Sequence, residues 1–283
     1  MSDLLRIQWS DGHASEYVAR WLRDNCYSEA ERKRRKHRPV LWDANITDAL
    51  PEADFREVSR NPAARLGMLR TICDTGFCLV RNIPQTKTAS RQLIELVGPQ
   101  RKSHYGTYPL SSKNAVDNVG DTTGPLDPHT DETYRLSTIG ITVFQVLRPA
   151  SSGGESTLMG GFEAVERLRQ LCPEAFDLLA NVRVTTRRRD LARNSGGQPR
   201  FYSARMPLIR IDEDGDVVGV RLNERQIGPL DLPEAQIDPF YRALRRLFEL
   251  VYNPALRITL PLETGEGLLF NNQRLLHGRT EYQ

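Results

Sequence analysis

The feature that most restricts the fold of this chain is the tripeptide His129-Thr130-Asp131, combined with a lone histidine far downstream, His277. A double-stranded β-helix uses this arrangement to present two imidazoles and one carboxylate to a single metal ion. Three protein ligands that leave open positions suit non-haem Fe(II) and oxygen chemistry. Taken alone the pattern is weak, because His-x-Asp recurs by chance and ordinary core or surface histidines would also produce it.

The sequence around these residues strengthens the metal interpretation. Thr122-Thr123-Gly124 precedes the tripeptide, and the apolar, β-rich run 139–147 follows it and predicts a central strand. A Gly-Gly-acid-Ser segment comes next at residues 153–156, and a Gly-x-Gly-apolar strand over 265–270 leads to His277. Strands and turns therefore flank both parts of the motif, as a β-rich metal-binding domain requires.

Composition excludes several classes of function. A length of 283 residues allows one large domain, or a large domain with a small partner. The formal charge of +3 is too small to indicate a nucleic-acid partner, and the basic run 31–38 is typical of a solvated helix end. Because no apolar run is long enough for a membrane and no signal peptide is evident, we expect a cytoplasmic protein with no membrane partner. The four dispersed cysteines predict free thiols.

The N-terminal region carries the first family resemblance. Trp9-Ser10-Asp11-Gly12, followed by the stretch 21–26, resembles the small N-terminal domain of the γ-butyrobetaine and trimethyllysine dioxygenases, in which a cysteine begins a cluster of zinc ligands. Here Cys26 and His37 supply at most two of the four ligands that a structural zinc needs. We therefore expect no structural zinc and a small α+β domain that folds on its own small core. Tyr17, Val18, Trp21 and Leu22 fit helical spacing and predict a helix over 14–24.

The resemblance extends over essentially the whole chain, to the γ-butyrobetaine/trimethyllysine dioxygenase-like branch of the taurine dioxygenase superfamily. It implies an α+β chain in which residues 1–52 are the small domain and linker and residues 53–283 are a double-stranded β-helix (jelly-roll) catalytic domain. It also implies a dioxygenase that uses Fe(II), 2-oxoglutarate as cosubstrate, and O₂. The expected metal ligands are His129, Asp131 and His277.

The cosubstrate site departs from the family. 2-Oxoglutarate needs a cation for its distal carboxylate, and arginine suits a carboxylate best. The family arginine would lie about a dozen residues beyond the distal histidine, past Gln283, so we expect that the C-terminal end of the domain is missing. Ser156 or Thr157 stands where the family often has a hydroxyl that contacts the cosubstrate, and Arg279 is an outside candidate for the cation.

Substrate residues are implied by the resemblance alone. Tyr105 and Tyr108 match two positions of the family's aromatic cage for trimethylammonium, whereas Asp121 replaces a third aromatic residue. A carboxylate there suits an amine that donates hydrogen bonds. At the anionic end, Asn118, Asn223 and Arg148 match or replace family residues. Together they predict a small zwitterionic amine or betaine with a carboxylate or phosphonate end.

Three functions remain open from the sequence. The first is hydroxylation of such a zwitterion, and the second uses the same iron chemistry for desaturation, cyclisation or rearrangement. The third is an inactive binding or scaffold relative, against which the intact ligand set argues. The resemblance also implies a homodimer, and the Arg- and Gly-rich segment 185–198 is a candidate lid over the site.

Overall fold

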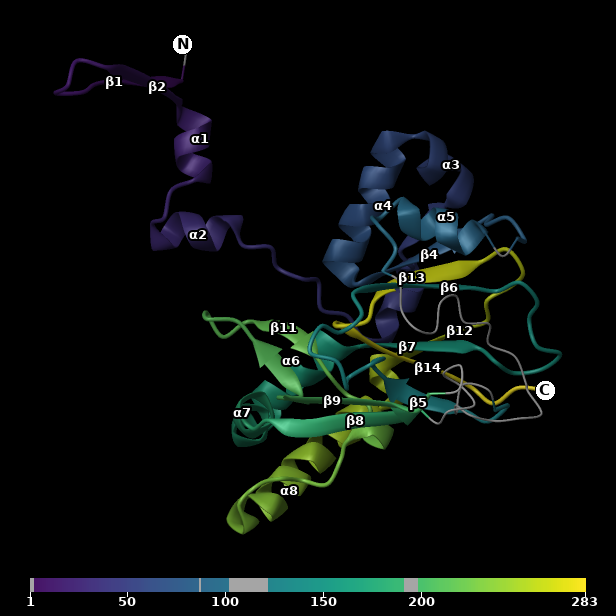
Figure 1. The fold of residues 1–283 in the computed structure, drawn as a ribbon. Coiled ribbons are helices and arrows are strands. Elements are labelled where there is room, and N and C mark those ends of the chain that lie inside the picture. Colours follow the sequence, from purple (N-terminus) through teal and green to yellow (C-terminus); the bar gives the residue numbers. More distant parts are fainter. Residues whose placement is uncertain (1–2, 87, 102–121, 191–197) are drawn as a thin grey trace. The chain divides into compact units, whose positions relative to one another are not determined.

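The computed structural model describes residues 3–86, 88–101, 122–190 and 198–283. The chain divides into two compact units, Met1–Pro39 and Val40–Gln283 (Figure 1). The larger unit contains all three predicted metal ligands. Among the described residues, no helix is long and apolar enough to cross a membrane.

The smaller unit begins with a β-hairpin. Strands β1 (Leu4–Gln8) and β2 (Ala14–Val18) pair antiparallel across a turn in which Gly12 has a φ of 92°, a left-handed conformation that favours glycine. The helix expected over 14–24 is therefore wrong in its first half. Residues 14–18 alternate across the strand, and their main chain pairs with β1 rather than with itself.

Two short helices complete the smaller unit. They are α1 (Ala19–Asp24) and α2 (Glu29–Arg35), and the side chain of Ser28 caps α2. No described residue of this unit is buried, so the small core that we expected is not present in residues 3–39. A unit this short has too little apolar surface to enclose a core of its own.

Two four-stranded sheets form the centre of the larger unit. The first has the order β3-β4-β13-β6, and only β3 and β4 run parallel; the second has the order β12-β7-β14-β5 and is antiparallel. Their strands are β3 (Glu52–Asp54), β4 (Phe77–Arg81), β13 (Gly267–Asn271), β6 (Ile141–Gln145), β12 (Arg257–Leu260), β7 (Ser156–Gly160), β14 (Leu275–Arg279) and β5 (Leu126–His129). Strands distant in sequence thus lie side by side, with β14 between β5 and β7.

The two sheets enclose a common apolar layer. Leu79 and Phe270 from the first sheet pack in one cluster with Leu158 and Ile258 from the second. Because alternate residues of a strand point to opposite faces, the residues two positions along each strand also face this layer. This arrangement is consistent with the expected jelly-roll core, and it places β14 with one face turned inward.

Helices cover the outer face of the first sheet. These are α3 (Phe55–Arg60), α4 (Pro62–Thr75) and α5 (Ala89–Glu95), which lie over β4 in Figure 1. Cys78 and Val80 of β4 pack against Met68 and Ile72 of α4. The apolar pattern of the sequence predicts a helix from about residue 63 and a strand over 77–80, and both are confirmed.

The ends of α4 follow from its sequence. Asn61 accepts hydrogen bonds from the N–H groups of Ala63 and Ala64 at the start of the helix. At the other end Gly76 has a φ of 90°, and a β-carbon there would come within 2.9 Å of Arg274. The Arg274 guanidinium uses this space to donate to the carbonyls of Cys73 and Asp74, which a helix end leaves without partners.

The remaining elements pack beside the sheets, and most of them contribute to a further apolar core. They are α6 (Gly161–Leu171), α7 (Pro173–Asn181), β8 (Val184–Asp190), β9 (Arg200–Met206), β10 (Ile209–Ile211), β11 (Val217–Val220) and α8 (Glu234–Val251), with 3-10 turns at Ala44–Ala49, Glu224–Gln226 and Pro254–Leu256. The sequence predicts a hairpin over 201–222 that turns at residues 212–216; β10 and β11 form this hairpin, whereas β9 pairs with β8 instead. Residues 191–197 of the candidate lid lie outside the described residues.

Candidate metal centre

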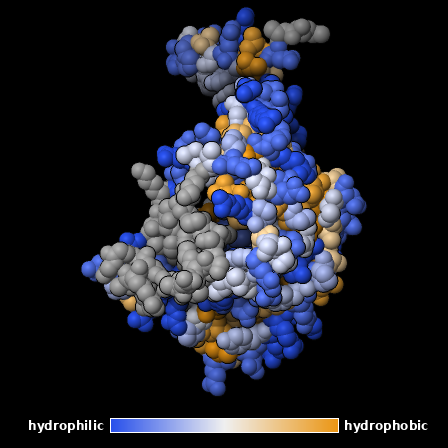
Figure 2. Space-filling model, turned by 90° about the vertical axis from the view of Figure 1, so that its right-hand side faces the viewer, coloured by the Kyte–Doolittle hydropathy of each residue, from blue (hydrophilic) through white to orange (hydrophobic). Residues whose placement is uncertain are grey.

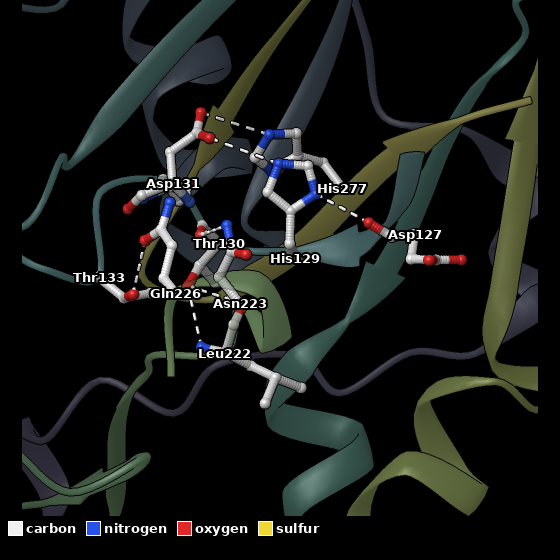
Figure 3. Close-up of polar contacts among 10 residues, drawn as sticks. Asp127, His129, Thr130, Asp131, Thr133, Leu222, Asn223, Gln226 and His277 are labelled. Carbon is white, nitrogen blue, oxygen red and sulfur yellow. Dashed lines mark hydrogen bonds and ion pairs between the residues drawn. The ribbon is translucent and has the colours of Figure 1, made fainter. Parts of the chain in front are cut away.

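Strands β5 and β14 bring the predicted metal ligands together. His277 of β14 is the register partner of His129 at the end of β5, and their ring centroids are 4.4 Å apart. Asp131 follows β5, and its two carboxylate oxygens lie 3.4 Å from Nε2 of His129 and 3.4 Å from Nε2 of His277 (Figure 3). One ligand atom from each residue lies within 4.8 Å of the others.

The site is buried on one side and open on the other. His277 lies opposite Leu158 of β7, and its ring packs 4.8 Å from the Phe270 ring in the layer between the sheets. The side chain of Asp131 is 40% exposed, against 10% for His129 and 19% for His277. Among the three ligands, the Asp131 carboxylate is therefore the one most open to solvent.

A main-chain carbonyl orients His129. Nδ1 of the ring lies 2.8 Å from the carbonyl oxygen of Asp127, which accepts its proton (Figure 3). The proton is therefore held on Nδ1, and the lone pair on Nε2 points toward Asp131. Fixing the far nitrogen of a ligating histidine in this way is a common support for metal binding.

The electrostatics of the site match a metal centre. Burial would raise the pKa of the Asp131 carboxyl, but its interactions with the adjacent rings of His277 and His129 outweigh burial and lower that pKa. Burial lowers the pKa of His277 and so favours its neutral ring. An ionised carboxylate and neutral imidazole are the forms in which these side chains bind metals.

The residues fit Fe(II) better than other common metals. A pair of imidazoles with one carboxylate is the ligand set of non-haem Fe(II) oxygenases, whereas structural zinc sites are usually closed by four ligands. Among the described residues, His129, Asp131 and His277 form the one group of histidine, cysteine and acidic side chains close enough to share an ion.

The predicted cosubstrate residues lie on strands next to the histidines. Arg279 of β14 is the register partner of Ser156 on β7, and each is two residues from the pair His277 and Leu158. Ser156 therefore belongs to the inner face that carries His277. β14 has a register shift against β5 between His277 and Arg279, and Arg279 lines a pocket together with Thr157. Thr157 belongs to the opposite face, where a β-carbon at Gly278 would lie 2.9 Å from its hydroxyl.

A pocket of about 260 Å³ opens beside these strands. It is lined by Pro125, Leu126, Asp127, Thr157, Arg257, Thr259, Arg279, Thr280 and Glu281. The guanidinium of Arg279 also donates to the carbonyls of Thr122 and Gly124. Figure 2, which views the right-hand side of Figure 1, shows a hollow near the centre of a mostly hydrophilic face.

The predicted substrate residues are only partly described. Asn223 is 4% exposed; its Nδ2 lies 3.4 Å from the carbonyl of Thr130, and its Oδ1 is buried with no partner among the described residues. Arg148 is exposed, just beyond β6. Four residues lie outside the described ranges: Tyr105, Tyr108, Asn118 and Asp121.

Two residues that hold the loop after β5 were missed from the sequence. Asn272 pairs with the main chain of Asp131, and the buried Arg221 donates to carbonyls of the loop that follows. Both bind main-chain atoms, which every residue carries, so no side-chain pattern in the sequence indicates their partners. The sequence offers one indication for Asn272, which is its position directly after the strand that leads to His277.

Comparison with known proteins decides the family. The model of the "Taurine catabolism dioxygenase TauD, TfdA family" matches residues 34–283. The chain belongs to this family. The family assignment made from the sequence is confirmed.

Relatives within the family match nearly the whole chain. Gamma-butyrobetaine dioxygenase of Pseudomonas sp. (strain AK-1) is 30% identical over 282 residues, covering 98% of this chain and 71% of the relative. Trimethyllysine dioxygenase of Meyerozyma guilliermondii is 27% identical over 298 residues, covering 98% of this chain and 73% of the relative. Human gamma-butyrobetaine dioxygenase is 27% identical over 285 residues, with 98% and 72% covered.

Solved structures share the fold. An asparagine oxygenase in complex with Fe(II), hydroxyasparagine and succinate superimposes with a TM-score of 0.56 at 13% identity, covering 82% of this chain and 88% of that one. The non-haem iron oxygenase OrfP, in complex with Fe and α-ketoglutaric acid, superimposes with a TM-score of 0.55 at 15% identity, covering 82% of this chain and 89% of that one. With the family and the His-Asp-His cluster, the chain is an Fe(II)- and 2-oxoglutarate-dependent dioxygenase.

Proposed function

We propose that this enzyme hydroxylates an unactivated C–H bond of a small zwitterionic amine or betaine with a carboxylate or phosphonate end. The observation that carries the proposal is the convergence of His129, Asp131 and His277 from β5 and β14. Relatives named gamma-butyrobetaine and trimethyllysine dioxygenases support the substrate class. No feature of the described residues favours desaturation, rearrangement or an inactive scaffold over hydroxylation.

His129, Asp131 and His277 would hold the iron through two imidazole nitrogens and one carboxylate. Bound Fe(II) supplies a coupled oxidation, in which one O₂ converts 2-oxoglutarate to succinate and CO₂ and the substrate C–H to C–OH. Asp127 keeps the proton of His129 on Nδ1, away from the ligand nitrogen. The sheets bury the histidine side of the site and exclude water there, so reactants enter past Asp131.

For the cosubstrate we propose Ser156 and Arg279 as the hydroxyl and the cation. Ser156 belongs to the strand face that carries His277, Arg279 is its register partner on β14, and a guanidinium matches the distal carboxylate of 2-oxoglutarate. Thr157 is the weaker of the two candidate hydroxyls, because it belongs to the opposite face of β7.

For the substrate we propose Tyr105, Tyr108, Asn118, Asp121, Arg148 and Asn223 as contacts. Asn223 has the strongest support, since a buried amide oxygen without a partner is costly unless a ligand donates to it. Its Nδ2 faces the Thr130 carbonyl, so the amide presents an acceptor rather than a donor. Asn223 therefore suits an N–H or O–H of the substrate better than the anionic end to which the sequence assigned it.

Four further expectations remain predictions of the same proposal. They are the domain boundary near residue 52, the absence of structural zinc, a homodimer, and a cytoplasmic location. The first has a structural alternative, since the compact larger unit begins at Val40 and Trp42 packs in the layer between the sheets.

The proposal is tested by measuring succinate release with Fe(II), 2-oxoglutarate and O₂ against a panel of amines, betaines and aminophosphonates. We expect release above the uncoupled background with a zwitterionic amine, and none with the His277→Ala variant. An enzyme that binds Fe(II) and 2-oxoglutarate but responds to no member of the panel would contradict the substrate class.

The Asp121→Tyr variant separately tests the position at which Asp121 replaces an aromatic residue of the family's cage. A third aromatic side chain should shift preference toward trimethylammonium compounds, because a quaternary cation is attracted to ring faces and donates no hydrogen bond. An unchanged substrate profile would remove Asp121 from the substrate site.

A further inference from the structure

Asn272 makes a two-point contact with the residue that supplies the carboxylate of the metal centre. It lies in the turn between β13 and β14 and is 1% exposed. Its Oδ1 accepts the Asp131 N–H at 2.7 Å, and its Nδ2 donates to the Asp131 carbonyl at 3.1 Å. Both hydrogen-bonding groups of the Asp131 main chain are thus held by one planar amide.

This contact restrains both main-chain torsions of Asp131. The N–H belongs to the peptide plane before the Cα atom, and the C=O belongs to the plane after it. Holding both planes limits rotation about φ and ψ, and it thereby sets the direction in which the Cβ atom and the carboxylate leave the chain. A contact to either group alone would leave the other torsion free.

The main chain beyond Asp131 does not hold this geometry by itself. Glu132 has a φ of 52°, a left-handed conformation that costs a non-glycine residue free energy and persists only where surrounding contacts impose it. The residues after it, up to 140, form turns and bends rather than a helix or strand. The direction of Asp131 therefore depends on contacts from elsewhere in the fold.

Asn272 also connects Asp131 to His277. The N–H of Asn272 donates to Gly140 at 2.9 Å, and the N–H of Asn271 donates to Gly76 at 2.8 Å, so the turn is anchored on two sides. β14 begins three residues later and carries His277 in its centre. One rigid turn thus determines where β14 starts and where the Asp131 main chain lies.

We infer that Asn272 is a positioning residue that preorganises the metal centre by fixing the Asp131 main chain relative to His277. The inference rests on the proposed function only in taking His129, Asp131 and His277 as the metal ligands. Residues that orient metal ligands typically contribute about 10- to 100-fold to metal affinity. An effect on affinity, rather than on folding alone, is what distinguishes this role from a structural one.

The test compares metal affinity in Asn272→Ala, Asn272→Asp and Asn271→Ala by anaerobic titration with Fe(II), and with Co(II) as a second probe. Asn272→Asp keeps the side-chain volume but replaces the donor that faces the Asp131 carbonyl with an acceptor. Asn271 is the matched control, since its Oδ1 accepts the N–H of Gln273 in the same turn and no other hydrogen bond from the described residues. We expect about tenfold or greater loss in both Asn272 variants and less than about twofold in the control.

Thermal unfolding of the metal-free variants measures the folded fraction of each variant. Metal affinity is then compared for that folded fraction alone, so a loss of affinity is separated from a loss of folding. If both Asn272 variants fail to fold, amide hydrogen exchange of the metal-free wild type decides. The Asp131 N–H should then exchange at least about 100-fold more slowly than exposed amides of α2. Rapid exchange at Asp131, affinities of the folded Asn272 variants within twofold of wild type, or an equal loss in the control would overturn the inference. A wild type that binds neither metal would instead contradict the metal centre itself.

Discussion

Arg221 supports the loop after Asp131 at residues further along the chain than those that Asn272 contacts. The residue is 3% exposed, and its guanidinium donates to the carbonyls of Thr133, Arg135 and Leu136. Burial, and secondly the charge of Arg210, lowers the pKa of Arg221 to about 10, so it remains a cation at neutral pH. Main-chain carbonyls rather than a carboxylate thus compensate much of the cost of burying this charge.

Replacing Arg221 with methionine should lower the free energy of unfolding by about 3 kcal/mol, because buried carbonyls lose their donors. Urea unfolding followed by circular dichroism measures the change. Arg242→Met is the control, since Arg242 is largely exposed and its ion pair with Asp238 is long, at 3.9 Å. Equal stability of the Arg221 variant and wild type would show that the loop does not depend on this cation.

The thiols give a second prediction for individual residues. Cys78 of β4 is fully buried, and burial, with a smaller effect of the Glu52 charge, raises its pKa to about 12. Cys73 is exposed at the end of α4. A thiol-specific reagent at pH 8 should therefore label Cys73 rapidly and Cys78 only after denaturant is added, because the thiolate is the nucleophile.

Single Cys→Ser variants identify the two phases of that reaction. Cys73→Ser should remove a fast phase, and Cys78→Ser should leave it intact. Labelling of Cys78 at the rate of Cys73 in native buffer would contradict the packing of β4. The same pKa increase predicts a stability loss as pH rises from about 9 toward 12, because the unfolded chain loses this proton first.

At the scale of elements, the pairing of β14 with its neighbours determines the site. A slip of one residue would turn His277 to the outer face, where Gly278 now lies. Only glycine fits at position 278, because neighbouring strands approach its Cα closely. A β-carbon there would lie 2.2 Å from the Leu126 carbonyl oxygen and 2.9 Å from Thr157 Oγ1. The register shift between His277 and Arg279, where β14 pairs with β5, lies at the same place.

Gly278→Ala should therefore displace β14 from β5. We expect a loss of about 2 kcal/mol in stability from overpacking, together with weaker Fe(II) binding, because His129 and His277 move apart. Calorimetry and metal titration of the purified variant measure both. Unchanged stability and affinity would mean that β14 is free to shift without disturbing the site.

Gly67→Ala should have the opposite effect on stability from Gly278→Ala. Gly67 lies exposed in the middle of α4, and a β-carbon there would have no neighbour within 4 Å. Alanine loses less conformational entropy in a helix, so stability should rise by about 0.5–1 kcal/mol. Thermal unfolding gives the sign, and a destabilised variant would contradict the position of α4.

The elements differ in how well their sequence predicts them. α4 and β4 were predicted because apolar residues at helical spacing, a glycine that ends the helix and a short apolar run follow one another. β2 was taken for the start of a helix, since Tyr17, Val18 and Trp21 fit helical spacing and strand pairing is invisible in one sequence. β6 was expected to be central, but it lies at the edge of its sheet among the described residues, and its side chains are half-buried.

At the scale of the whole molecule, the metal ligands were predictable and their surroundings were not. The ligand set is defined by side-chain chemistry, which the sequence shows directly. Its supports are the Asp127 carbonyl, the Asn272 amide and the Arg221 guanidinium, and each acts through main-chain atoms that only the fold brings together. The family model begins at residue 34, so it adds little about the smaller unit.

The most direct test of this account is an anaerobic titration of the enzyme with Fe(II) and 2-oxoglutarate, followed by visible absorption. We expect a weak charge-transfer band that saturates at one Fe(II) per chain and is absent from the His129→Ala, Asp131→Ala and His277→Ala variants. Ser156→Ala should bind Fe(II) as wild type does, but it should need more 2-oxoglutarate to reach the full charge-transfer band. A band that persists in the folded His277→Ala variant, or its absence from wild type, would contradict the metal centre described here.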